Sequence, residues 1–224
     1  MVADPSHSVR VLHADDCAVV LCKPSGLLSV PGRGLDKQEC AARQVQSQYP
    51  DARVVHRLDQ ATSGLMIFAR GPEAQRALSR AFAQRRVHKR YCAVVAGHLH
   101  ARVADQDGWA LIDLPIAPDW PQRPRRIVDP LRGKTSLTRW RVLAHGQSGQ
   151  GQPQTRVLLE PLTGRTHQLR VHMAAMGHPI VGDTLYGDHT QAMVHQRLML
   201  HACTLCVPQL DHWPGGCWQS TPPF

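Results

Sequence analysis

Arg57 and Asp59 are the residues of this sequence whose types and spacing most directly suggest chemistry. They stand two positions apart in HRLDQATSG, the polar core of the stretch VVHRLDQATSGLMIFAR. In an extended chain, residues i and i+2 point the same way, so both side chains can face one cleft. A carboxylate there can act as a nucleophile, as a general base or as half of an ion pair. A surface salt bridge and a turn-capping aspartate are the alternatives, which these residues alone leave open.

Two further clusters could contribute hydrogen-bond donors and an aromatic face. GRTHQLR, residues 164–170, places Arg165, His167 and Arg170 at the expected start of a helix, where backbone N–H groups attract phosphate. A solvated basic helix start is the alternative. Tyr91 follows two cations in KRY. A tyrosine in a strand usually belongs to the core, but this ring could instead stack on a base.

The sequence lacks the common cofactor and metal motifs. It contains no P-loop, no GxGxxG after an expected strand and no HExxH, which argues against ATP, dinucleotide or metal chemistry. His201, Cys203 and Cys206 could form half of a zinc site, but no second pair follows at ligand spacing. We therefore expect neither a cofactor nor a metal. A carboxylate that acts on a nucleotide without them points to glycosidic-bond chemistry on an extracted base.

The composition favours an anionic partner. Lys and Arg total 26 against 17 Asp and Glu, which gives a net charge of +9 over 224 residues. Nucleic acid is the simplest polyanion, and a merely basic soluble protein is the alternative. No apolar run is long enough to cross a bilayer, and the first residues lack a signal-peptide core. We expect a cytoplasmic protein whose seven cysteines are free thiols.

Strands and helices must hold these clusters in place. Apolar runs on both sides of HRLDQATSG predict strands joined by a polar turn, and Gly71-Pro72 opens a helix whose apolar residues recur at helical spacing. Further strands are expected at 17–23, 89–97, 137–144, 155–161 and near 198–207, helices at 36–48 and after Gly164, and a long surface excursion over 101–135. This mixture, rich in strands, indicates an α+β fold.

HRLDQATSG closely resembles the HRLDxxTSG active-site motif of the RluA-type pseudouridine synthases. Other segments that resemble the family follow in its order: CKPSGLLSVPG, KRYCAVVAGH, DLPIAPDWPQRP, TGRTHQLRVHMAAMGHPIVGD and LHA. VPGR and DLPIAPDWPQRP resemble the RluA branch, whose members modify uridines in both ribosomal RNA and transfer RNA. The resemblance implies an α+β fold with a mixed, mainly antiparallel sheet core and flanking helices. It also implies one catalytic domain over residues 1–224 without an S4-like RNA-binding domain, and we expect a monomer.

The resemblance also implies roles for residues within these motifs. Asp59 matches the catalytic aspartate that attacks the target uridine, so that the base detaches and rejoins the ribose through C5. Tyr91 matches the active-site tyrosine that packs on the base. Arg170 matches the basic residue that pairs with the catalytic carboxylate. Arg57 matches the arginine that fills the gap left by the flipped uridine, which offsets part of the cost of flipping.

The remaining candidates concern RNA binding. His56 and Arg165 lie in the same motifs and would support the site or hold phosphates, and His167 would add a donor. Arg125 and Arg126 belong to an arginine-rich segment expected to grip RNA, with solubility as the alternative. Two other functions stay open. One is a non-catalytic RNA-binding protein with the same fold, and the other is a glycosidic hydrolase, which would need a second carboxylate.

Overall fold

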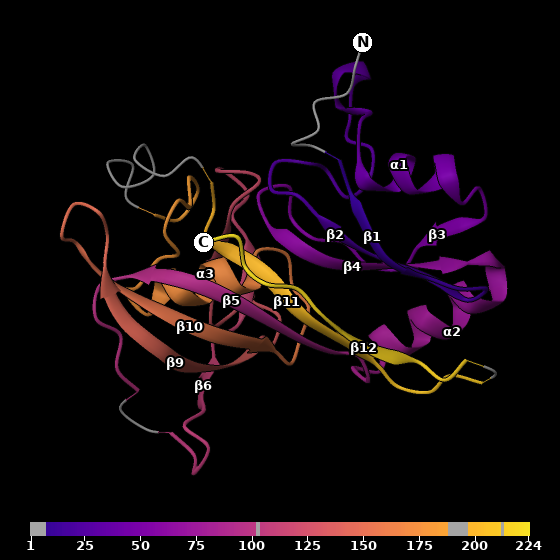
Figure 1. Ribbon diagram of the computed structural model, residues 1–224. Coiled ribbons are helices and arrows are strands. Elements are labelled where there is room, and N and C mark those ends of the chain that lie inside the picture. The colour runs from indigo at the N-terminus through magenta and orange to yellow at the C-terminus, as the bar shows by residue number, and fades with distance from the viewer. Residues whose placement is uncertain (1–7, 102–103, 188–196, 212) are drawn as a thin grey trace. The chain divides into compact units, whose positions relative to one another are not determined.

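Two compact units make up the chain. The computed structural model describes residues 8–101, 104–187, 197–211 and 213–224. Unit 1 comprises residues 1–89 and 201–223, and unit 2 comprises residues 90–200 together with Phe224. Both units contain strands and helices, most of which Figure 1 labels.

Unit 1 is built on a sheet whose neighbouring strands are mostly antiparallel. Its strands are β1 (Arg10–Ala14), β2 (Ala18–Lys23), β3 (Ala52–Val54), β4 (Ser63–Arg70), β11 (Leu200–Val207) and β12 (Gly216–Gln219). β2 lies between β1 and β4, β3 pairs with the end of β4, β11 pairs with the beginning of β4, and β12 pairs with β11. The β4–β11 pair is parallel. Residues at the beginning and the end of β4 are thereby fixed by different partners.

Helices cover both faces of this sheet. β2 and β4 are buried along nearly their whole length, so their side chains need apolar partners on each side. On one face, α2 (Gly71–Ala83) packs Leu78 and Ala81 into a cluster with Val20 and Ile67. In Figure 1, α1 (Ala41–Gln48) lies on the opposite side of β2 and β4 from α2, and its apolar side is buried. The central strands therefore form the core of unit 1.

The two helices of unit 1 differ in how well the sequence predicts their first residues. α2 begins at Gly71-Pro72, as predicted. The helix expected over 36–48 is shorter, because a 3-10 turn, η2 (Leu35–Lys37), comes first and α1 begins at Ala41. Cys40 is extended, with φ −162°, and bridges to an earlier segment of the chain. That contact prevents the helix from starting before Ala41. The helix propensities of residues 36–40 could not predict it, because it involves another segment of the chain.

Unit 2 holds a second set of antiparallel strands. β5 (His88–Ala96), β10 (Pro153–Pro161), β9 (Leu137–Gln147) and β6 (Ala110–Asp113) pair in that order, and β7 (Ile116–Pro118) pairs with β8 (Arg126–Val128). α3 (Gln168–Ala175) contacts β8 and β10. The expected surface excursion over 101–135 is wrong in part, because it contains β6, β7 and β8. These strands are short, and β6 depends on pairing with β9, so local periodicity was too weak to reveal them.

These elements confirm the predicted fold class. The strands pair mainly in the antiparallel sense, the β4–β11 pair makes the arrangement mixed, and a few helices flank the strands. In the part of the chain that the structure describes, no helix is long and apolar enough to cross a membrane.

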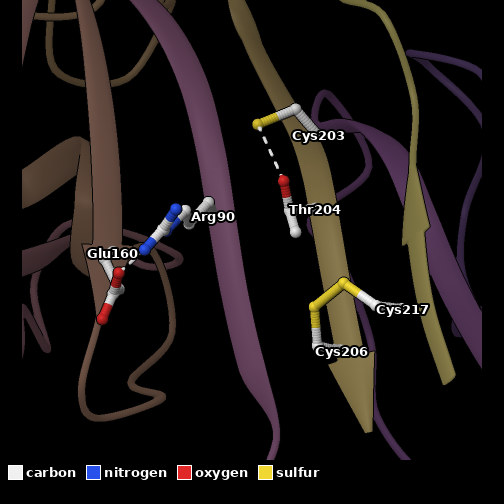
Figure 2. The surroundings of a disulfide bond; sticks show 6 residues. All are labelled: Arg90, Glu160, Cys203, Thr204, Cys206 and Cys217. Atoms are coloured by element: carbon white, nitrogen blue, oxygen red, sulfur yellow. Dashed lines mark hydrogen bonds and ion pairs between the residues drawn. A yellow bond between two sulfur atoms is a disulfide. The ribbon is translucent and has the colours of Figure 1, made fainter.

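The prediction of seven free thiols is wrong for two cysteines. Cys206 and Cys217 form a disulfide between β11 and β12, where they face each other in register (Figure 2). The sequence did not show that β12 returns along β11.

His201, considered above as a zinc ligand, instead forms side-chain hydrogen bonds with Ser63 (2.8 Å) and Ser220 (3.0 Å). The described residues contain no group of three candidate ligands that could hold a metal ion.

Candidate active site

The loop that contains Asp59 joins β3 to β4 in unit 1. Asp59 is half-buried, Leu58 is buried and Arg57 is exposed. The Thr62 amide donates a hydrogen bond to the Asp59 carbonyl (3.1 Å), which closes a turn directly after the carboxylate. The side chains at positions 57 and 59 therefore have different surroundings although they lie close in sequence.

A buried lysine fixes this loop. Lys23, at the end of β2, is fully buried, and its ammonium group donates to the carbonyls of Pro24 (2.8 Å), Leu27 (2.7 Å) and Gln60 (3.1 Å). A buried charge is tolerated when hydrogen bonds replace its hydration, so these carbonyls have to stay in place. Gln60 directly follows Asp59. Lys23 therefore restrains the backbone next to the carboxylate.

Short polar residues of CKPSGLLS add restraints to the same loop. The Ser29 hydroxyl donates to the Leu58 carbonyl (2.7 Å) and accepts from the Leu58 amide (3.1 Å). The Ser25 hydroxyl donates to the Ala61 carbonyl (2.7 Å). CKPSGLLS and HRLDQATSG thus form one hydrogen-bonded structure. The sequence analysis assigned no role to Lys23, although a lysine that ends the apolar run CAVVLCK was a usable signal.

His56 is held between β4 and α2 in unit 1. Its Nε2 accepts a hydrogen bond from the Ile67 amide (3.0 Å), and its ring stacks on Phe82 with the centroids 4.6 Å apart. Burial, together with the charge of Lys89, lowers the pKa of His56 to about 3, so the ring is neutral at pH 7. Of the two roles expected for His56, these contacts fit support of the site better than a charged contact with phosphate.

In unit 2, GRTHQLR forms the turn before α3 and the beginning of the helix. His167 precedes the helix with a left-handed backbone, φ 57°. The buried amide oxygen of Gln168 accepts from the Thr163 hydroxyl (2.7 Å) and the Arg165 amide (3.0 Å), and its nitrogen donates to the Leu137 carbonyl (2.9 Å). Gln168 was not identified from the sequence, yet it holds the turn that contains Arg165 and His167.

Arg170 on α3 is buried and makes a bidentate ion pair with Asp183. Its Nε and Nη2 each lie 2.7 Å from a carboxylate oxygen of Asp183, which is 1% exposed. Asp183 also accepts hydrogen bonds from the amides of Leu185 (2.9 Å) and Tyr186 (3.1 Å). This geometry holds the guanidinium in one orientation. The sequence analysis missed Asp183, although it is the one carboxylate in TGRTHQLRVHMAAMGHPIVGD.

Tyr186 brings several of the expected residues together. Its hydroxyl accepts the Arg126 amide hydrogen (2.8 Å) and lies 2.7 Å from Nδ1 of His167. The guanidinium carbons of Arg125 and Arg170 lie 5.7 Å and 5.2 Å from the centre of its ring. The structure therefore places these four residues around a tyrosine that the sequence analysis did not identify.

Two other candidates in unit 2 have different contacts. Tyr91 is half-buried on β5, opposite Leu159 of β10, and Nε of Arg165 donates to the Thr135 carbonyl (3.3 Å). Asp59 belongs to unit 1, whereas Tyr91 and Arg170 belong to unit 2. The expected pairing of Asp59 with Arg170 stays a prediction.

Comparison with known proteins defines the class of enzyme. The family model described as RNA pseudouridylate synthase matches residues 18–175, which is more than half of the chain. The chain belongs to this family, whose members isomerise uridine in RNA to pseudouridine. The predicted resemblance and the predicted isomerase activity are confirmed.

Individual relatives cover nearly all of the chain. The dual-specificity RNA pseudouridine synthase RluA of Yersinia pestis is 46% identical over 197 residues, 88% of this chain and 91% of its own. RluA of Escherichia coli K12 is 42% identical over 197 residues, 88% of this chain and 85% of its own. The solved structure of human RNA pseudouridylate synthase domain containing 1 matches with a TM-score of 0.80 and 31% identity, covering 100% of this chain and 87% of that one.

Proposed function

We propose that this protein converts specific uridines in ribosomal RNA and transfer RNA to pseudouridine, with Asp59 as the nucleophile and no cofactor. Its similarity to relatives named dual-specificity RNA pseudouridine synthase supports more than one class of RNA. The net charge of +9 suits a polyanionic substrate. In this proposal the protein is a cytoplasmic monomer, and residues 1–224 act as one catalytic domain.

The restrained Asp59 loop is the observation that supports this proposal best. A nucleophilic carboxylate works only if it is held at a fixed position relative to its target. Lys23 bonds to Gln60 and Ser29 bonds to Leu58, so the backbone is restrained on both sides of Asp59. A turn without a function would gain little from a buried ammonium group, because burying that charge is costly.

The reaction is an isomerisation, so the product has the same atomic composition as the uridine. The bond between N1 and the ribose breaks, a bond between C5 and the ribose forms, the C5 proton leaves, and N1 gains a proton. Asp59 would start this sequence by attacking either the ribose or the base ring. Tyr91 would pack on the base and assist the proton transfer, as the resemblance implies. This balance requires no oxidant or reductant.

Basic residues would serve the reaction in separate ways. Arg170, oriented by Asp183, would pair with the catalytic carboxylate, as the resemblance implies. Arg57 is exposed and would enter the space left by the flipped uridine, which offsets part of a stacking loss of roughly a few kcal/mol. The residues proposed to contact the RNA backbone are Arg125, Arg126, Arg165 and His167. His56 would support the loop, as its contacts suggest.

Asp59→Asn tests the proposal. The variant keeps the shape of the side chain but removes the nucleophilic charge, so we expect turnover to fall by at least about 10⁴-fold while RNA binding persists. Tritium release from RNA labelled at C5 of uridine measures the loss of the C5 proton. Asp16→Asn changes an exposed aspartate of unit 1 and serves as the matched control. Unchanged turnover in Asp59→Asn would exclude this nucleophile. RNA binding without any turnover by the unmodified protein would favour the non-catalytic alternative.

A further inference from the structure

Trp120 stands at the tip of the β7–β8 hairpin and is 65% exposed. The other tryptophans are much less accessible, since Trp109, Trp140 and Trp213 are buried and Trp218 is half-buried. An indole usually contributes to stability by being buried. The exposed Trp120 ring does not stabilise the fold in this way, so it is a candidate for binding a partner.

Arg123 stacks on this indole. Its guanidinium carbon lies 3.8 Å from the ring centre, and Arg123 is itself exposed. A cation over the face of an indole is a favourable contact that limits the orientations of both groups. The guanidinium covers one face of Trp120, and the large exposed fraction leaves room for another planar group on the ring.

Hydrogen bonds within the tip hold its backbone in shape. The Asp119 amide donates to the Arg125 carbonyl (3.1 Å), and the Arg125 amide donates to the Gln122 carbonyl (2.9 Å). The Gln122 amide donates to the Asp119 carboxylate (3.3 Å). These bonds order the tip without involving the indole. A surface that is already ordered loses less entropy when it binds a partner.

The base of the hairpin is anchored to the rest of unit 2. The Tyr186 hydroxyl accepts the amide hydrogen of Arg126, the first residue of β8 (2.8 Å). Ile116, the first residue of β7, exchanges two main-chain hydrogen bonds with Lys134 (3.0 Å and 2.9 Å). Trp120 therefore lies at the end of a supported hairpin.

We propose that Trp120 and Arg123 form a stacking platform for an unpaired base of the RNA substrate, other than the uridine that is isomerised. The proposal rests on RNA being the substrate. Unpaired bases stack on aromatic rings and on guanidinium planes, whereas the bases of a duplex already stack on one another. Arg125 and Arg126 come two and three residues after Arg123 and could contact the adjoining phosphates. The platform selects RNA that has a single-stranded loop.

Binding to two synthetic RNAs tests the platform. For a hairpin with a single-stranded loop that contains uridine, Trp120→Ala is expected to weaken binding by about 5- to 150-fold through lost stacking. Trp120→Phe should keep most of the affinity. Leu131→Ala removes another exposed apolar side chain, 94% exposed, and should bind like the unmodified protein. A blunt duplex of the same length should bind all four proteins equally.

Salt dependence separates stacking from charge. Trp120→Ala should leave the slope of log affinity against log salt concentration unchanged. Arg125→Gln should reduce the magnitude of that slope by about one, because it removes one phosphate contact. A smaller slope in Trp120→Ala would mean that the indole had been supporting phosphate contacts, which contradicts the platform.

Tryptophan fluorescence tests the platform without turnover. The difference in acrylamide quenching between the unmodified protein and Trp120→Phe reports on Trp120. The RNA hairpin should protect this signal, and the duplex should not. Unchanged quenching at saturating hairpin, or equal binding by Trp120→Ala, would overturn the proposal. Because these readouts need only RNA binding, a result against Asp59 as the nucleophile would leave them valid.

Discussion

Lys23 in unit 1 and Arg170 in unit 2 are both buried cations, yet they are stabilised in different ways. Lys23 donates to three main-chain carbonyls, whereas Arg170 makes a bidentate pair with a carboxylate, that of Asp183. An ammonium group is a compact donor that can bind carbonyls of several segments. A guanidinium is a planar fork that matches one carboxylate. The lysine therefore shapes a loop, and the aspartate orients an arginine.

This difference corresponds to what the proposed reaction needs from each unit. In unit 1 the backbone around Asp59 has to be held, and Lys23 acts on that backbone. In unit 2 the Arg170 side chain has to be oriented, and Asp183 acts on that side chain. Lys23 and Asp183 are positioning residues, and substitutions at each should affect stability and turnover in different proportions.

Lys23→Met should have the largest effect on stability. The substitution keeps much of the side-chain volume but leaves three carbonyls without this donor, that of Leu27 in a fully buried contact, so we expect a loss of about 3–5 kcal/mol in the free energy of unfolding. Urea denaturation measures this loss. Lys37→Met, which changes an exposed lysine, should be close to neutral. A loss below about 1 kcal/mol would show that these carbonyls find other donors.

Asp183→Asn should follow, with a loss of about 3 kcal/mol, because the buried Arg170 guanidinium loses its counter-charge. The double variant Asp183→Leu with Arg170→Met replaces the pair by apolar groups. We expect it to regain stability in thermal denaturation but not turnover. Asp113→Asn, an exposed residue of unit 2, is the control. Full turnover in the double variant would rule out the proposed role of Arg170.

Removal of the disulfide should cost somewhat less and act on unit 1. Cys206→Ser opens a covalent link between residues 11 positions apart, which corresponds to about 2–3 kcal/mol. Hydrogen exchange should become faster in β11 and β12 and stay unchanged in β9 and β10. Cys203→Ser, at a cysteine of β11 outside the disulfide, is the matched control. Titration of the denatured, unreduced protein should find five thiols, and seven thiols would contradict the disulfide.

At pH 7 the smallest effect is that of His56, because its effect on stability appears only as the pH falls. Its pKa is about 3 in the folded protein, below the ordinary value of 6.5, so the unfolded chain takes up the proton first as pH falls. The neutral His56 ring therefore favours the folded state fully above pH 6.5. This part of the free energy of unfolding is lost as the pH falls from 6.5 to about 3. The slope is at most about 1.4 kcal/mol per pH unit. In His56→Gln the denaturation midpoint should depend less on pH than in the unmodified protein. His100→Gln, at an exposed site, serves as the control.

The sequence by itself determined the family, the loop that contains Asp59 and the first turn of α2. HRLDQATSG is polar between two apolar runs, so the chain has to leave the core there and re-enter it. Gly71-Pro72 begins a helix because proline is tolerated in the first turn, where its missing N–H would have no partner. These features depend on residues that are close together in the chain, and local patterns report on such neighbours.

Only the tertiary structure decided which distant residues support these motifs. Gly64 ends HRLDQATSG, which was expected to form a polar turn, but it lies in β4 with φ 113°, and a Cβ there would collide with the Ala202 backbone of β11. Lys23 bonds to Gln60, 37 residues later, and Cys206 meets Cys217 because two strands run side by side. Propensity and periodicity describe a residue and its neighbours. The partner of a buried charge or of a paired strand depends on which segments fold together.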